Sequence, residues 1–132
     1  MNYRSTGKTV FSAKYHIIFC PKYRRRVLGG PVAPRLEEIL RGVCAEHHAN
    51  VLGLEVMPDH VHLLIDLPPA VALSRLLHML KGRSSHRLRQ EFPSLQRLPT
   101  LWTRSWFVAT VGGAPLAVVQ RYVENQQDAA AR

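Results

Sequence analysis

Cysteine is scarce in this sequence. Its 132 residues include only two cysteines, Cys20 and Cys44, and neither belongs to a CxxC pair. Two cysteines cannot build the disulfide framework that stabilises small secreted domains. We therefore expect a protein of a reducing compartment, the cytoplasm.

Long apolar runs are also absent. Stretches such as Ile17–Cys20 and Val61–Ile65 fall far short of the roughly 20 residues that a helix needs to cross a bilayer. The first eight residues lack the apolar segment of a signal peptide. These features predict a soluble protein that has no membrane partner.

Acidic residues are few: 9 Asp and Glu stand against 18 Lys and Arg, which gives a formal net charge of +9. The composition is nevertheless that of a folded domain, because 46% of the residues are hydrophobic and only 20% are charged. This excludes a disordered basic tail. A single domain spanning residues 1–132 with a polyanionic partner is expected, and nucleic acid is favoured over a membrane surface.

The hydropathy pattern predicts alternating strands and helices around a basic loop at Pro21–Pro34. Stretches with the alternation of strands are Val10–Cys20, Val51–Met57, His60–Asp66 and Trp106–Val111. Stretches with the spacing of helices run from Val32 to His48, from Leu73 to Leu88, and from Pro115 to about Asp128. The order β-α-β-β-α-β followed by a terminal helix is the ferredoxin-like, RRM-like arrangement of the α+β class.

In such a fold two helices cover one face of a four-stranded antiparallel sheet and leave the other face open. Along His60–Asp66, the alternation directs Val61, Leu63 and Ile65 toward the helices. It directs His60 and His62 toward the open face. Residues two apart on a strand lie about 6.6 Å from each other, so two imidazoles can converge on one divalent cation. Two polar residues on a solvated strand would show the same pattern.

The last predicted helix carries Tyr122 and Gln126, which lie four residues apart and therefore on one helical face. A tyrosine in a helix is usually a half-buried structural residue. As a nucleophile it would need activation, because the reference pKa of a phenol is about 10.

Basic residues gather in two clusters. The first is Lys22, Arg24, Arg25 and Arg26, which surround Tyr23; the second is Lys81, Arg83, Arg87 and Arg89. Two such clusters in a small basic domain are suited to binding the phosphates of a nucleic acid. They could also be solvated surface residues, or they could bind the acidic substrate of an enzyme. We expect both clusters to border the open face of the sheet, with Lys22, Arg24, Arg25, Lys81, Arg83 and Arg87 as the candidates for binding the phosphates of a nucleic acid.

Several motifs occur together in a specific order. They are YHIIF at 15–19, PKYRR at 21–25, MPDHVHLL at 57–64, LKGRSS at 80–85 and RYVENQ at 121–126. Together they resemble the small single-tyrosine HUH transposases, the IS200/IS605-type (IS200-like) family of insertion sequences that move as single-stranded DNA. The likeness covers a core of about residues 8–127. HUH denotes His, a bulky apolar residue and His, which His60-Val61-His62 matches.

The resemblance implies roles for particular residues. His60 and His62 would bind a divalent metal, Gln126 would add its amide oxygen, and Tyr122 would be the catalytic nucleophile. The nitrogen and oxygen ligands alone permit zinc, manganese or other cations, and the resemblance selects Mg²⁺ or Mn²⁺. It further implies cleavage and rejoining of single-stranded DNA at hairpin-bearing ends through a 5′-phosphotyrosine. A homodimer with edge strands joined is implied as well, with active sites completed in cis or in trans.

Three alternatives remain open from the sequence. A domesticated host relative acting on repeated palindromic DNA would use the same chemistry. A non-catalytic hairpin-binding module would share the sheet, although the strands lack the paired exposed aromatic residues that stack bases in RNA-recognition domains. A small-molecule enzyme using the two histidines would leave the net charge unexplained.

Overall fold

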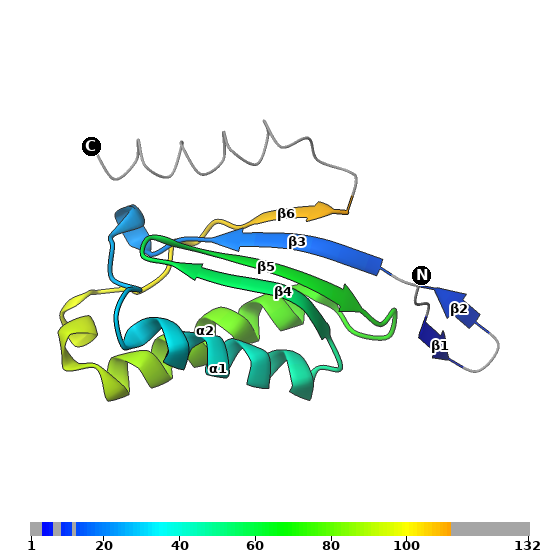
Figure 1. Ribbon diagram of the computed structural model, residues 1–132, viewed down its shortest axis with the longest axis horizontal. Coiled ribbons are helices and arrows are strands. Elements are labelled where there is room, and N and C mark those ends of the chain that lie inside the picture. Colours follow the sequence, from blue (N-terminus) through cyan, green and yellow to red (C-terminus); the bar gives the residue numbers. More distant parts are fainter. Residues whose placement is uncertain (1–3, 7–8, 12, 112–132) are drawn as a thin grey trace.

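The structure is a computed structural model that describes residues 4–6, 9–11 and 13–111 (Figure 1). The strands and helices follow one another as β1 (Arg4–Thr6), β2 (Thr9–Phe11), β3 (Ala13–Phe19), α1 (Val32–Glu46), β4 (Asn50–Met57), β5 (His60–Leu67), α2 (Leu73–Glu91) and β6 (Phe107–Thr110). Short 3-10 turns cover Lys22–Arg24 and Pro93–Arg97. No helix in these described ranges is long and apolar enough to cross a membrane.

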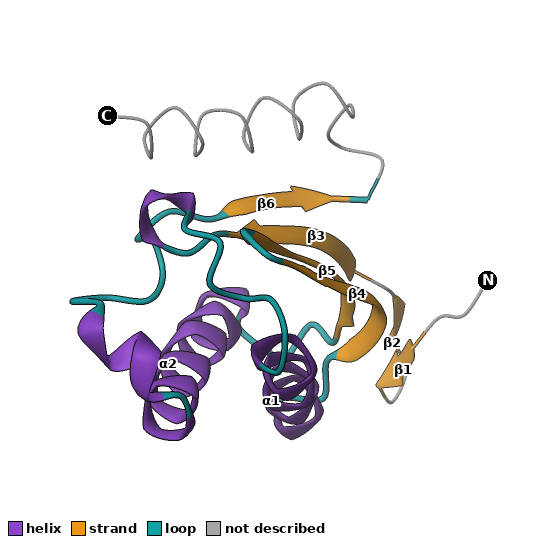
Figure 2. Ribbon diagram, turned by 60° about the vertical axis from the view of Figure 1, so that its left-hand side comes forward, coloured by secondary structure: helices purple, strands orange, loops and turns teal. Residues whose placement is uncertain are grey.

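The main sheet has the strand order β4-β5-β3-β6, and neighbouring strands are antiparallel throughout. Helices α1 and α2 lie side by side on one face of this sheet, as Figures 1 and 2 show. This arrangement confirms the predicted α+β, ferredoxin-like β-α-β-β-α-β fold. The first and third strands of the fold, β3 and β5, form its centre, so β5 is fixed in register on both sides.

The core lies between the sheet and the two helices. Strand β5 contributes Val61, Leu63 and Ile65, all fully buried, as the alternation predicts. Central strand β3 adds Ile17 and Phe19 from the same face. Helix α1 meets them with residues at helical spacing, namely Leu36, Ile39, Leu40, Val43 and Cys44. Burial of the apolar side of each element therefore fixes which side of β5 is left for polar residues.

The beginning of the chain differs from the prediction. The expected single strand Val10–Cys20 is divided, because β2 pairs with β1 in a separate two-stranded sheet and β3 starts only at Ala13. Strands of three residues are too short for alternation to reveal them. Helix α1 ends at Glu46 rather than His48, and His48 has a positive φ of 58° that ends the helical path.

Both cysteines are free and buried. Burial raises the pKa of each thiol to about 11. Neither thiol is therefore prepared for nucleophilic or redox chemistry at neutral pH. The expected C-terminal helix, with Tyr122 and Gln126, lies outside the described residues.

Candidate functional site

The two histidines of the HVH segment lie on the face of the sheet opposite the helices. Strand β5 alternates, so His60 and His62 flank the buried Val61 and point away from the core. Across the sheet, His62 is paired with Ile18 of β3 and with Glu55 of β4. The fold thus places both histidines where the sequence predicts them.

His60 is oriented by the residue that precedes it. Its Nδ1 lies 2.8 Å from Oδ1 of Asp59, in the tight turn between β4 and β5. An ionised carboxylate only accepts hydrogen bonds, so Nδ1 carries the hydrogen and donates it. The lone pair of the imidazole is then on Nε2, which is the atom left to bind a cation.

Asp59 is held in turn by Arg24 from the turn after β3. The Nε of Arg24 lies 2.8 Å from Oδ2 of Asp59, and the two side chains are only 14% and 15% exposed. Burial works to raise the pKa of Asp59, but the hydrogen bond from His60 and the charge of Arg24 outweigh it and hold the pKa below its usual value. Asp59 is therefore an anion at neutral pH, able to orient His60.

His62 has a different partner. Its Nε2 lies 2.9 Å from Nδ1 of His16 on β3, and the two rings are stacked with centroids 5.1 Å apart. Burial and the neighbouring His16 lower the pKa of His62, so its ring is neutral at pH 7. Sequence reasoning did not select His16, although the alternation of β3 places it on the open face with Lys14 and Ile18.

The residues present fit a divalent cation, because two imidazoles share one face and a carboxylate orients one of them. Within the described part of the chain, no three His, Cys, Asp or Glu side chains are grouped so that they could hold a metal ion. Further ligands would have to come from elsewhere, as the expected role of Gln126 requires. A hollow of about 130 Å³ beside His16, Glu55 and His62 opens on this face.

The first basic cluster adjoins this site through the contact of Arg24 with Asp59. Around the exposed ring of Tyr23 stand Lys22, with its Nζ 5.4 Å from the ring centroid, and Arg25, with its guanidinium 5.5 Å away. Arg25 is exposed, whereas Arg24 is turned inward. Arg25 is thus exposed and Lys22 partly exposed, in the turn whose Arg24 reaches Asp59 beside His60.

The second basic cluster does not border the open face, and this part of the prediction is wrong. It lies on α2, which covers the opposite face of the sheet (Figure 1). Arg83 pairs there with Glu46 of α1 at 2.6 Å. Arg87 is exposed on the same helix.

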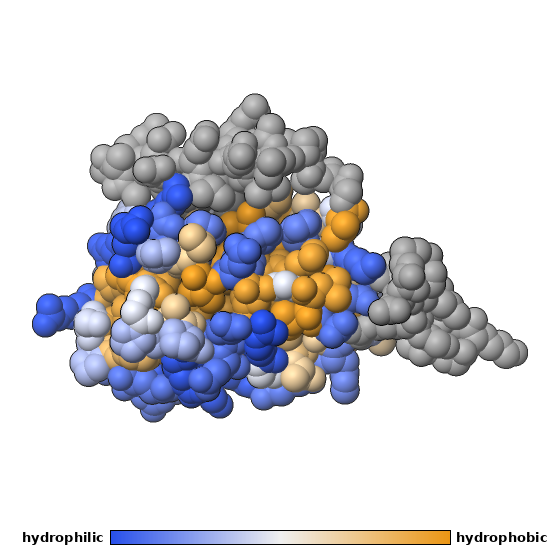
Figure 3. Space-filling view, viewed as in Figure 1, coloured by the Kyte–Doolittle hydropathy of each residue, from blue (hydrophilic) through white to orange (hydrophobic). Residues whose placement is uncertain are grey.

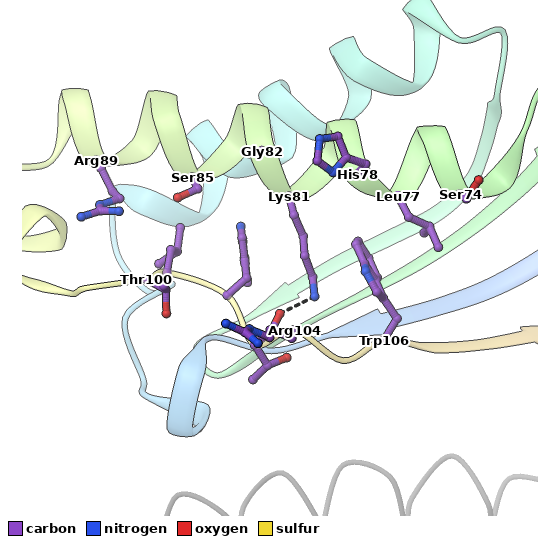
Figure 4. A pocket seen from close by; sticks show the side chains of 13 residues that line it. Ser74, Leu77, His78, Lys81, Gly82, Ser85, Arg89, Thr100, Arg104 and Trp106 are labelled. Carbon is purple, nitrogen blue, oxygen red and sulfur yellow. Dashed lines mark hydrogen bonds between the residues drawn. The ribbon is translucent and has the colours of Figure 1, made fainter.

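Lys81 is drawn into the protein. Its Nζ donates to the carbonyl oxygens of Thr103 and, at 2.9 Å, of Ser105, and it lies 4.1 Å from the ring centroid of Trp106 (Figure 4). Burial lowers the pKa of Lys81 to about 8. It lines a pocket of about 600 Å³ between α2 and the segment that leads into β6. In this position Lys81 holds that segment against α2.

The match to known proteins covers nearly the whole chain. Residues 9–126 match the family described as Transposase IS200 like. The chain belongs to this family. IS200-like transposases similar to it include the ISDra2 transposase TnpA of Deinococcus radiodurans, which is 40% identical over 122 residues, 90% of this chain and 87% of that protein. The transposase of insertion sequence IS200 from Salmonella typhimurium is 36% identical over 126 residues, 93% and 82% of the two chains.

Solved structures agree with this family assignment. A candidate transposase from Deinococcus radiodurans R1 superposes with a TM-score of 0.85 at 35% identity, covering 93% of this chain and 97% of that one. A REP-associated tyrosine transposase bound to a REP hairpin has a TM-score of 0.62 at 15% identity, covering 93% and 68%, and shows the shared fold alone. The protein is thus an enzyme of DNA transposition, as its motifs indicated.

Proposed function

We propose that this IS200-like transposase cleaves and rejoins single-stranded DNA at hairpin-bearing ends of an insertion sequence. Tyr122 would be the nucleophile, and His60, His62 and Gln126 would hold Mg²⁺ or Mn²⁺. The observation that supports this most directly is the orientation of His60 by Asp59, which leaves Nε2 free on the open face beside a neutral His62. Exposed polar residues on a solvated strand would need no such carboxylate.

The bound cation would polarise the scissile phosphate and offset the charge that develops on its oxygens. The chain's own part is to bind and orient. Asp59 keeps the Nδ1 hydrogen of His60 in place, and burial keeps His62 neutral, so both rings can present a lone pair.

The covalent step takes place at Tyr122. Its phenolic oxygen attacks the phosphorus in line, a bond forms between that oxygen and phosphorus, and the bond from phosphorus to the 3′ oxygen breaks. The phenol loses its proton to solvent and the departing 3′ oxygen gains one. The products are a 5′-phosphotyrosine and a free 3′-OH. Attack by another 3′-OH reverses the step, which requires no ATP because the phosphotyrosine preserves a phosphodiester bond.

The DNA backbone would be held chiefly by the first basic cluster. Lys22 and Arg25 flank Tyr23 in the turn after β3, the same turn whose Arg24 contacts Asp59 beside His60. Arg87 is exposed on the opposite layer and would serve a more distant part of a hairpin. Lys81 and Arg83 have partners within the protein and would contribute less.

A homodimer is part of the proposal. Strands β4 and β6 form the two edges of the sheet, and an edge strand can pair with a second copy. Strand β4 supports this role because it is eight residues long and exposes Leu52 and Met57 by 44% and 42%. Figure 3 shows an apolar band that runs along the sheet, above the hydrophilic surface of the helices. Sedimentation equilibrium of the wild type and of Leu52→Lys would test the pairing.

The decisive experiment incubates the full chain with hairpin-bearing single-stranded DNA and Mg²⁺ or Mn²⁺ and looks for a covalent protein–DNA adduct on a denaturing gel. Tyr122→Phe should abolish the adduct and retain hairpin binding, whereas the control Tyr23→Phe should still form it. His60→Ala should lose cleavage but keep most of the affinity. An adduct formed by Tyr122→Phe would refute the assignment of Tyr122 as the nucleophile. If the wild type binds the hairpin but never cleaves it, the protein is a non-catalytic hairpin-binding module.

A further inference from the structure

The turn after β3 has an unusual backbone. Tyr23 and Arg24 both lie in the left-handed region, with φ values of 61° and 50°. Residues with a Cβ atom disfavour this region, and they persist there when the surrounding structure holds them. The turn directs the two side chains oppositely: Tyr23 is 49% exposed, whereas the side chain of Arg24 is 14% exposed and reaches Asp59.

Backbone hydrogen bonds hold this turn on both sides. The N–H of Lys22 donates to Leu101 at 2.9 Å, on the segment that leads to β6. Four residues after Arg24, the N–H of Leu28 donates to the carbonyl of Pro58 at 3.0 Å. Pro58 directly precedes Asp59, so the turn and the β4–β5 hairpin form one anchored unit.

We propose that Arg24 is a positioning residue of the metal centre rather than a phosphate-binding residue. It engages Oδ2 of Asp59, which leaves Oδ1 to accept the Nδ1 hydrogen of His60. The inference rests on the proposed role of His60 as a metal ligand. The orientation of His60 then depends on a residue 36 positions earlier in the chain, because Arg24 contacts Asp59 and Asp59 in turn contacts His60.

Geometry and burial support this role. The side chains of Arg24 and Asp59 are only 14% and 15% exposed, and the guanidinium of Arg24 holds one carboxylate oxygen of Asp59 while the other faces His60. Without Arg24 the carboxylate could turn away from Nδ1 of His60, and the ring could then take either tautomer. With Arg24 in place, Nδ1 carries the hydrogen and Nε2 keeps its lone pair. The adjacent Arg25 is exposed, which makes it the matched control.

The first test measures the tautomer of His60 by ¹⁵N NMR on the full chain without metal and without DNA. The wild type and Arg25→Gln should show the Nδ1–H form of His60. Arg24→Gln should show a mixture of the two tautomers. A His60 resonance in Arg24→Gln identical to that of the wild type would overturn the proposal.

The second test titrates Mn²⁺ into the same proteins by calorimetry, again without DNA. Asp59→Asn and Arg24→Gln should each weaken Mn²⁺ binding by about tenfold or more, the usual effect of losing a residue that orients a metal ligand. The double variant should be no weaker than Asp59→Asn alone, and Arg25→Gln should bind as the wild type does. Arg24→Lys keeps the charge but not the planar geometry of the guanidinium, so its Mn²⁺ affinity should lie between those of the wild type and Arg24→Gln. It replaces Arg24→Gln in the test if that variant does not fold.

The outcomes separate this inference from the proposed function. If His60→Ala weakens Mn²⁺ binding and neither Arg24→Gln nor Arg24→Lys does, Arg24 has no positioning role and the metal centre stands. If Arg24→Gln weakens hairpin binding as Arg25→Gln does while its Mn²⁺ affinity is unchanged, Arg24 binds phosphate. If His60→Ala binds Mn²⁺ as the wild type does, the metal centre and the inference are both refuted.

Discussion

Replacing Ser84 with alanine should destabilise the protein far more than the loss of one oxygen atom suggests. Ser84 is fully buried on α2, and its Oγ donates to the carbonyl of Leu80 at 2.6 Å. The same Oγ accepts a hydrogen bond of 2.9 Å from Nε1 of Trp102, which is 7% exposed. In Ser84→Ala the indole N–H has no acceptor at this position. A buried donor left without a partner costs about 1–3 kcal/mol.

The expected shift in Tm follows from the size of the chain. An unfolding entropy of about 2.1 cal/mol/K per residue gives about 280 cal/mol/K for 132 residues, so 1 kcal/mol corresponds to about 3.6 °C. We therefore expect Ser84→Ala to lower Tm by about 4–11 °C in scanning calorimetry.

The matched control is Ser85→Ala, the next residue on α2, which is half-buried at the edge of the pocket. It should leave Tm nearly unchanged. A double-mutant cycle with Trp102→Phe should show coupling, because Ser84→Ala costs less once the indole N–H is gone. If Ser84→Ala and Ser85→Ala shift Tm equally, or if the cycle shows no coupling, the assigned hydrogen bond does not stabilise the fold.

Four further outcomes are expected. Because burial raises the pKa of Cys20 and Cys44 to about 11, neither thiol should react rapidly with Ellman's reagent at pH 8 until the protein is unfolded; rapid reaction of the native protein would contradict their burial. Leu63→Ala should cost about 2–5 kcal/mol in urea unfolding while Leu52→Ala on the exposed edge costs much less, and equal effects would refute the assignment of faces on β4 and β5. Burial lowers the pKa of Lys81 to about 8, so between about pH 8 and 10.4 the unfolded chain binds more protons at this lysine and its contribution to stability should rise with pH; the two buried thiols act in the opposite sense above about pH 9, so the measurement is the difference in urea midpoint between the wild type and Lys81→Met, which should shift in favour of the wild type as pH rises. Hairpin affinity should fall steeply as salt increases, and a flat dependence would exclude phosphate contacts as the main source of binding.

Much of the fold was predictable because it depends on local patterns. The alternation along β5 identified the buried Val61 and Leu63 and the opposite face with His60 and His62, since the period of a strand leaves only two sides. The hairpin of β1 and β2 was missed because three-residue strands carry no detectable period. His16 was overlooked because its contact with His62 joins two strands far apart in the sequence.

The basic residues show where such reasoning reaches its limit. From the sequence, Arg24, Lys81 and Arg83 were equivalent cationic side chains suited to phosphates. In the structure Arg24 contacts Asp59, Lys81 is drawn under the segment before β6, and Arg83 pairs with Glu46. Each partner lies at least 22 positions away along the chain, so no local spacing encodes the contact.

The alternation of the strands and the spacing of the two helices determined the fold class, and the ordered motifs determined the family. Those properties are read from residue types and short spacings, which do not depend on how distant segments meet. The tertiary structure decided which cations remain on the surface, which layer carries each basic cluster, and which nitrogen of His60 faces outward. Such outcomes depend on burial and on contacts between distant segments, because only the packed chain brings Arg24 within 2.8 Å of Asp59, whose other carboxylate oxygen accepts the hydrogen bond from His60.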